Sequence, residues 1–192
     1  MHDFVHLRLH TEFSVTDGIL RINDAVNLAA SHQMYALAMT DLHNIFGLVK
    51  FYKACRNKGI KPIIGAELNV EGDDETNHYK ILVLVKNLAG YRSLCKLITR
   101  SFTENKILDI PYVKDEWLLN ETQSDLIVLS GGIGGDIGHL IINNKIDVAI
   151  ARAKRWALAF PDSYYIELQR FTHYPEVNLL ISKSVQIAKE TN

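Results

Sequence analysis

The sequence predicts a parallel α/β fold in which six strands form a barrel-like sheet that lacks its last strand or strands. Segments with strand and helix patterns alternate along the chain, which is the order typical of parallel α/β proteins. The segment 79–85 is nearly all apolar, as expected of a strand that is covered on both faces. The 192 residues, of which 47% are hydrophobic, suffice for one domain with a substantial core.

The strands are recognised by alternating apolar and polar residues or by short apolar runs. The first strand opens the chain, where this alternation extends from Val5 to His10. Its polar face carries imidazoles and is followed by Asp17, which suits a divalent metal, although Arg8 on the same face cannot ligate a cation. A solvated polar face is the alternative. Further strands are expected at 35–39, 61–70, 79–85, 126–130 and 164–168.

The helices are recognised by apolar residues that recur with a period of three to four. Gly59 and Pro161 follow two of these patterns, as expected of helix ends, and Pro175 lies at a favoured helix start. Because the chain stops in a helical segment with nothing after it to pack beside, we expect it to be part of a longer protein. The helices are expected at 22–29, 46–58, 91–102, near Trp117, at 145–160 and from Pro175 onward.

Composition limits the classes of function and compartment. The net charge is -1 and the pI is about 6.7, so we do not expect this chain alone to bind DNA tightly. The two cysteines, Cys55 and Cys95, match no zinc-binding spacing and are expected to be buried free thiols. We expect no signal peptide and no membrane-spanning segment in this sequence, which favours a reducing cytoplasm and no membrane partner.

Polar side chains collect at strand ends, where parallel α/β folds gather their functional groups. Glu67 lies between apolar residues of a strand, so its carboxylate needs a cation or hydrogen bonds. Thr40–Asp41 is interpreted equally well as a helix N-cap or as part of a site. His78 precedes its strand, and a surface position or an ordinary buried position is the more common environment for such a histidine. The other candidates are His10, Asp17, Asp41, His43 and Glu167.

The glycine-rich loop 131–136 follows the strand at 126–130. Such a loop can bind phosphate when it leads into a helix. Its spacing fails the dinucleotide pattern, because Ile137 stands where the third glycine belongs, and no P-loop lysine follows. A tight turn between strand and helix is therefore favoured.

Several stretches resemble one known family. The matching segments are 6–18, 38–41, 47–52, 59–67, 87–91, 129–132 and 165–170. They resemble the PHP (polymerase and histidinol phosphatase) domain at the start of the bacterial replicative DNA polymerase III alpha subunit, in order and over the whole chain. The resemblance implies a distorted β/α, TIM-like barrel. It also implies that residues 1–192 are one PHP domain without its C-terminal end, and that the polymerase parts follow.

Active members of this superfamily hold up to three metal ions, usually zinc, manganese or iron, and hydrolyse phosphoesters. The resemblance places metal ligands at His10, Asp17, Glu67 and His78. Three further ligand positions are replaced, by Arg8, Leu42 and Gly132. We therefore expect a vestigial metal site, no catalytic residue and no cofactor in this chain. Arg8 could instead pair with Asp17 or Glu67 and replace the metal structurally.

The leading interpretation is a non-catalytic PHP domain that supports the polymerase and binds the proofreading exonuclease subunit and other replicase subunits. DNA would be bound by the parent polymerase and only weakly by this chain. The second interpretation is a metal-dependent phosphoesterase or 3′–5′ exonuclease that uses zinc or manganese. The third is a separate small-molecule phosphatase, which the polymerase-like segments 47–52 and 59–67 disfavour.

Overall fold

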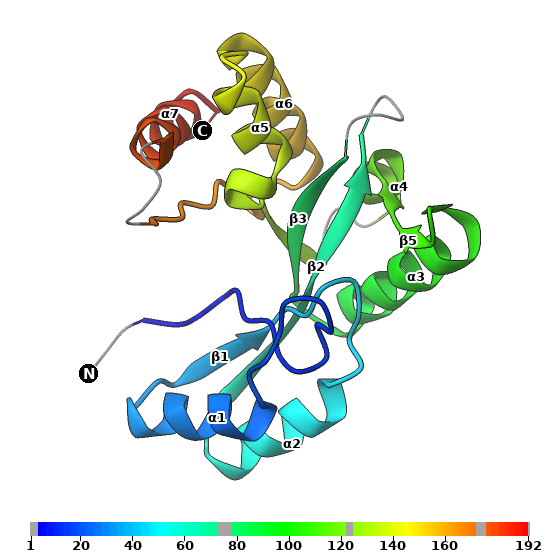
Figure 1. The fold of residues 1–192 in the computed structure, drawn as a ribbon, viewed down its shortest axis with the longest axis vertical. Coiled ribbons are helices and arrows are strands. Elements are labelled where there is room, and N and C mark those ends of the chain that lie inside the picture. Colours follow the sequence, from blue (N-terminus) through cyan, green and yellow to red (C-terminus); the bar gives the residue numbers. More distant parts are fainter. Residues whose placement is uncertain (1–3, 73–77, 122–124, 172–175, 192) are drawn as a thin grey trace.

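The computed structural model describes residues 4–72, 78–121, 125–171 and 176–191 (Figure 1). The strands are β1 Ala36–Met39, β2 Lys61–Glu71, β3 His78–Val85, β4 Lys106–Ile107, β5 Ile110–Pro111, β6 Val113–Lys114, β7 Leu126–Leu129 and β8 Tyr164–Tyr165. The helices are α1 Ile22–Ser31, α2 Leu48–Asn57, α3 Leu88–Glu104, α4 Asp115–Glu121, the 3₁₀ turn η1 Gly132–Gly134, α5 Asp136–Ile142, α6 Ile146–Ala159 and α7 Glu176–Thr191.

The main sheet is mixed rather than parallel. Its strand order is β1-β2-β3-β7-β8, and β6 pairs with β2 beside this path. The β1/β2 and β7/β8 pairs are parallel, whereas β3 is antiparallel to both β2 and β7. The prediction of a parallel sheet was wrong for β3, which follows β2 after only a short interval between Glu71 and His78. A parallel pair needs a long crossover connection, so two strands separated by so few residues must pair antiparallel.

A closed barrel is absent from the part of the chain that the structure describes. The strands β1 and β8 lie at opposite ends of the strand order, and no pairing between them closes the sheet. The expected closed TIM-like geometry is therefore replaced by an open, mixed sheet. Its long β2–β3 ribbon connects the two ends of the molecule in Figure 1.

Both edges of the sheet are less regular than the sequence predicts. Residues 4–12 form no strand, although the backbone N–H groups of Ala38 and Thr40 donate to the carbonyls of His6 and Leu9. The opening segment therefore lies along the edge of β1. The last strand was predicted to reach 168 but ends at Tyr165, because the backbone N–H of Glu167 donates to the Ser130 hydroxyl instead of a strand carbonyl.

The helices pack in three groups, each with its own cluster of buried apolar side chains. Helices α1 and α2 pack with β1 around Met39 and Phe51, at the lower end of Figure 1. Helices α3 and α4 pack on β2 and β3, in a core that also contains Trp156 of α6. Helices α5, α6 and α7 form a third cluster around Ile141 and Ala153. The predicted helices are thus present, and α5 is an addition that the sequence pattern did not delimit. Pro175, the expected start of the last helix, lies outside the described residues.

A buried ionic cluster joins α4, α5 and α6. The Arg152 guanidinium lies 2.9 Å from carboxylate oxygens of both Asp115 and Asp136. The Tyr79 hydroxyl donates to Asp115 at 2.6 Å, and the Trp156 indole N–H donates to Asp136 at 2.8 Å. Each buried charge therefore has a charged or hydrogen-bonding partner, as burial requires.

Cys55 is a buried free thiol, as predicted, whereas Cys95 is free but only half-buried. Burial raises the pKa of the Cys55 thiol to about 11, which makes it a poor nucleophile. Within the ranges given above, no helix combines the length and the apolar character needed to cross a membrane.

Candidate functional site

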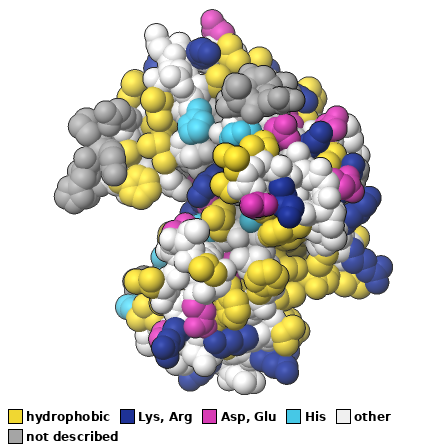
Figure 2. All heavy atoms as spheres, turned by 45° about the vertical axis from the view of Figure 1, so that its right-hand side comes forward, with side chains coloured by type: hydrophobic (Ala, Val, Ile, Leu, Met, Phe, Trp, Pro, Cys, Tyr) yellow, Lys and Arg dark blue, Asp and Glu magenta, His cyan; other side chains and the backbone are white. Residues whose placement is uncertain are grey.

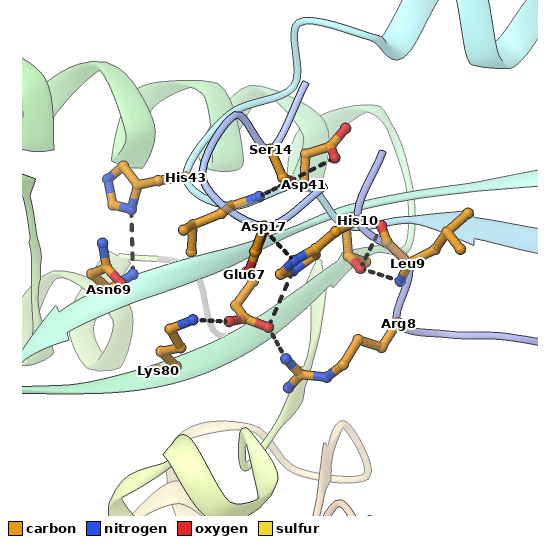
Figure 3. A network of polar contacts seen from close by, with 12 residues as sticks. Arg8, Leu9, His10, Ser14, Asp17, Asp41, His43, Glu67, Asn69 and Lys80 are labelled. Carbon is orange, nitrogen blue, oxygen red and sulfur yellow. Dashed lines mark hydrogen bonds and ion pairs between the residues drawn. The ribbon is translucent and has the colours of Figure 1, made fainter. Parts of the chain in front are cut away.

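Glu67 is the centre of a cluster of charged side chains on one face of β2 (Figure 3). Its side chain is 1% exposed. The Arg8 guanidinium contacts one carboxylate oxygen, and the Lys80 ammonium lies 2.9 Å from the other. The Nε2 atom of His10 lies 3.4 Å from the oxygen that Arg8 contacts. A buried carboxylate with two permanent cations has the compensation that its burial requires.

Strand register explains how Lys80 reaches Glu67. Glu67 is paired with Leu82 across the antiparallel β2/β3 ladder. Side chains two residues apart on a strand share a face, so Lys80 lies diagonally opposite Glu67 on the same side of the sheet. The sequence already indicated a special role for Lys80, because it is the only Asp, Glu, Lys or Arg residue in β3.

Arg8 joins Glu67 to a second carboxylate. Its Nε and Nη2 atoms donate to the two oxygens of Glu167 at 2.8 and 2.7 Å. This two-point geometry is the strong form of the arginine–carboxylate pair. The Gln169 amide also donates to Glu167, at 2.8 Å. The expected pairing of Arg8 with Glu67 is therefore confirmed, and Glu167 is an additional partner that the sequence did not predict.

Asp17 pairs with His10 and not with Arg8. The Oδ1 atom of Asp17 lies 3.0 Å from Nδ1 of His10. The loop that carries Asp17 is tight, because a Cβ atom at Gly18 would collide with the backbone carbonyl of Thr11. His10 thus lies between Asp17 and Glu67 and contacts one with each ring nitrogen, while Arg8 and Lys80 contact the Glu67 carboxylate.

Asp41 fixes the loop that carries the site. It is fully buried and accepts hydrogen bonds from the backbone N–H of Thr11 at 2.6 Å and from the hydroxyls of Thr11 and Ser14 at 2.8 and 2.7 Å. Asp41 is not a helix N-cap, because α2 begins at Leu48. Of the two sequence interpretations, the N-cap is therefore wrong, and Asp41 takes part in the site by holding the loop of Thr11 and Ser14 through hydrogen bonds.

His43 is buried and points away from the cluster, toward Asn69 and α3 (Figure 3). Its Nε2 atom lies 2.6 Å from the Ser101 hydroxyl oxygen, and the backbone N–H of Asn69 donates to its Nδ1 at 3.3 Å. Burial lowers the pKa of His43 to about 4. The imidazole is therefore neutral at pH 7 and connects β2 to α3.

His78 is not part of the cluster. It is paired with Glu71 at the start of β3, four residues before Leu82, which faces Glu67. The centroid of its ring lies 4.5 Å from that of the Tyr112 ring. The predicted grouping of His78 with the other candidates therefore does not occur, because the register of β3 brings Lys80 to Glu67 instead.

The remaining replaced positions offer no metal ligand. Leu42 forms an isolated parallel bridge with Glu67 through the backbone. Gly132 has φ of 60°, and a Cβ atom there would lie 2.6 Å from the Gln169 side chain. The glycine-rich loop is a tight turn, as predicted, since a Cβ at Gly131 would collide with the backbone carbonyl of Lys80.

These residues do not fit a metal cluster. Arg8 and Lys80 already contact the two oxygens of Glu67, and neither side chain can coordinate a cation at neutral pH. Across the residues for which the structure gives coordinates of sufficient certainty, no three His, Cys, Asp or Glu side chains are grouped to hold a metal ion. The Glu67 carboxylate is instead compensated by ion pairs with Arg8 and Lys80.

Comparison with known proteins gives one consistent family. The model of the PHP domain matches residues 6–171. DNA polymerase III subunit alpha of Neisseria meningitidis serogroup A is 41% identical over 189 residues, which are 97% of this chain and 16% of that protein. The Escherichia coli K12 subunit of the same name is 38% identical over 189 residues, again 97% of this chain and 16% of that protein.

The chain thus spans about 16% of the length of these relatives. A solved amidohydrolase from Chromobacterium violaceum is 24% identical, with a TM-score of 0.40 over 50% of this chain and 32% of that chain. The resemblance seen in the sequence is confirmed by the family match and by the two polymerase relatives. The chain belongs to the PHP domain family.

Proposed function

We propose that this chain is the PHP portion of a bacterial replicative DNA polymerase III alpha subunit and that it is a structural, non-catalytic part of that enzyme. The observation that carries the proposal is the position of Arg8 and Lys80 on the buried carboxylate of Glu67. The parent protein is then a DNA-directed DNA polymerase, a nucleotidyltransferase that acts in chromosome replication in the cytoplasm.

The charged cluster explains why hydrolysis is not expected. A metal-dependent phosphoesterase uses bound ions to generate a hydroxide and to stabilise the leaving oxygen. In this chain the oxygens of Glu67 are neutralised by side-chain cations, and the space above Gly132 contains the Gln169 side chain. Arg8 and Lys80 compensate the charge of the carboxylate, but they do not lower the pKa of a bound water molecule as a metal ion does.

A scaffolding role is supported by the elements that the cluster connects. Arg8 belongs to the opening segment, Glu67 to β2, Lys80 to β3, and Glu167 to the segment after β8. One network therefore holds both edges of an open sheet. Beside it lies a hollow of about 1390 Å³ with apolar lining that includes Phe4, Leu7, Ile64, Leu84, Leu129 and Leu168.

We propose that further strands of the same PHP domain, from the polypeptide that follows in the parent protein, fill this hollow. The other polymerase domains, the proofreading exonuclease subunit and other replicase subunits would then pack around the completed domain. The support is the family resemblance together with the amount of apolar surface that the open sheet leaves exposed.

The second candidate function is metal-dependent phosphoester hydrolysis, including 3′–5′ exonuclease activity, with zinc or manganese. The observation that favours it is the position of His10, whose ring nitrogens lie 3.0 Å from Asp17 and 3.4 Å from Glu67, so that three residues that can bind metal lie in sequence across the site. It requires that Arg8 and Lys80 leave Glu67 when metal is present.

Hydrolysis of bis-p-nitrophenyl phosphate and of a 3′-labelled single-stranded oligonucleotide, each with added Zn²⁺ or Mn²⁺, tests the proposal. The unmodified 192-residue chain and its Glu67→Gln variant should give the same background rate. Turnover by the unmodified chain that disappears in Glu67→Gln would overturn the non-catalytic proposal and support the second candidate.

A further inference from the structure

Cations are concentrated in one short part of this nearly neutral chain. Between residues 42 and 66 the sequence contains five Lys or Arg residues and no Asp or Glu, whereas the whole chain has 21 basic and 22 acidic residues. The five are Lys50, Lys53, Arg56, Lys58 and Lys61, on α2 and at the start of β2. In Figure 2, Lys and Arg side chains are visible along the lower end of the molecule, the end that contains α1 and α2 in Figure 1.

Four of these cations form what we call the basic strip: Lys53, Arg56, Lys58 and Lys61. All four are exposed, and over the described parts of the chain none of them makes an ion pair or a side-chain hydrogen bond. Lys50 differs, because its ammonium lies 2.6 Å from a carboxylate oxygen of Glu12. Since like charges repel, four neighbouring unpaired cations favour an anionic partner.

Exposed aromatic rings accompany the basic strip. Tyr52 is 51% exposed and lies four residues before Arg56, on the same side of α2, and next to Lys53 in the sequence. Tyr35 is 59% exposed and lines a hollow of about 320 Å³ together with Arg56 and Lys61. Exposed cations beside exposed tyrosines are a combination that can bind phosphates and stack bases of single strands.

Helix stabilisation explains only part of the basic strip. Arg56 and Lys58 lie at the C-terminal end of α2, where cations interact favourably with the free carbonyls. Lys53 lies in the middle of α2, and Lys61 lies on β2, so neither has this role. The two tyrosines add nothing to helix capping.

We propose that the basic strip, with Tyr35 and Tyr52, is a docking surface for single-stranded nucleic acid. The strip lies on α2 and the start of β2, away from the position of Glu67 further along β2. It is therefore a second functional surface and does not depend on whether the Glu67 cluster is catalytic. With four cations, the affinity is modest, with a Kd of about 10⁻⁴–10⁻⁶ M at physiological salt.

Fluorescence anisotropy of a labelled 20-nucleotide oligothymidylate with the purified chain tests the proposal. Binding should weaken with salt, with a slope of log K against log salt of about −2.8 for four contacts, since each contact contributes about −0.7 on a single strand. The Lys53→Glu, Arg56→Glu double variant should bind at least tenfold more weakly, and Tyr52→Ala about fivefold more weakly.

The matched control is the Lys154→Glu, Lys189→Glu double variant, which changes net charge equally at two exposed positions on α6 and α7. It should lose less than twofold. Far-UV circular dichroism of every variant confirms that the fold is retained, and a Lys53→Gln, Lys61→Gln variant provides a milder second test of the same surface.

Three results would overturn the proposal. The first is that the unmodified chain does not bind oligothymidylate at 50 mM salt. Another is equal loss in the basic-strip variant and in the control, which would show binding elsewhere. The third is tighter binding of a poly-glutamate peptide of equal charge than of oligothymidylate, which would assign the strip to an acidic protein segment.

Discussion

Arg8 donates to both carboxylate oxygens of Glu167 while its remaining terminal nitrogen contacts Glu67. One guanidinium thus pairs with two acids that come from β2 and from the segment after β8, and Lys80 supplies the second positive charge. The same guanidinium connects the opening segment of the chain to the opposite edge of the sheet. Because a guanidinium cannot lose its charge, Arg8 supplies a fixed positive charge at this connection without a metal ion.

Removal of Arg8 should destabilise the protein strongly. Arg8→Ala leaves the buried carboxylate of Glu67 with Lys80 and His10, and Glu167 with the Gln169 amide. Breaking a buried ion pair costs about 3–5 kcal/mol, and the remaining Lys80 contact places this variant near the lower value. Urea denaturation measures the free energy of unfolding. The exposed Arg92 provides the control, and Arg92→Ala should change it by less than about 0.5 kcal/mol. Equal stability of the two variants would show that Arg8 has no structural role.

Lys80 and Glu67 should be energetically coupled. Lys80→Met removes a cation 2.9 Å from Glu67 and should lower the free energy of unfolding by about 1–2 kcal/mol. In a Glu67→Gln background the same change should cost at least about 0.5 kcal/mol less, because no carboxylate charge remains to be compensated. Lys154→Met, far along the chain on α6, should be additive with Glu67→Gln. Additivity of Lys80→Met as well would contradict the coupling.

His43 should make stability depend on pH. Burial lowers the pKa of His43 to about 4 in the folded chain, against 6.5 for the ordinary imidazole. The unfolded chain therefore binds a proton that the folded chain does not bind between these values. The free energy of unfolding should fall as pH is lowered from 6.5 toward 4, by up to about 3 kcal/mol from this group, and this loss should not increase further below the folded pKa.

The difference in pH dependence between the parent and a His43→Gln variant measures this contribution. The variant should lose less stability than the parent between pH 6.5 and pH 4, whatever its absolute stability. His32→Gln, at an exposed position, is the matched control. Parallel pH curves for the parent and His43→Gln would show that His43 is not the titrating group.

Gly132 should not tolerate a side chain. Its φ of 60° is left-handed, and an added Cβ would lie 2.6 Å from Gln169. Gly132→Ala should destabilise the chain by about 1–3 kcal/mol, and adding Gln169→Ala should recover only the steric part of this cost. Gly134→Ala is the control, because a Cβ there meets Lys80 only at 3.7 Å. An unchanged melting temperature for Gly132→Ala would contradict this description of the loop.

Much of the fold was predictable because helix and strand periods are local properties of the sequence. The positions of α1 and α6 agree with their apolar spacing. The direction of β3 was missed, because the alternation of elements was taken as a parallel order. The short interval between Glu71 and His78 contains no room for a crossover helix and already indicated a hairpin.

The site was predictable only in part, since contacts across a sheet depend on register. Buried Glu67 could be identified from its apolar neighbours, and its pairing with Arg8 follows from the need to compensate a buried charge. Lys80 and His78 differ by two residues, and only the β2/β3 register shows which one reaches Glu67. The contact with Glu167 depends on how β8 ends, which no local pattern reveals.

The number of metal ions held by each chain tests most directly whether side-chain cations replace the metal cluster. The chain would be purified without chelator, incubated with Zn²⁺ and Mn²⁺, desalted, and analysed by elemental mass spectrometry. Because Arg8 and Lys80 contact the oxygens of Glu67, the measurement should find no stoichiometric di- or trinuclear cluster. Two or more tightly held ions per chain, lost together in Glu67→Gln, would contradict the replacement of the metal cluster by Arg8 and Lys80.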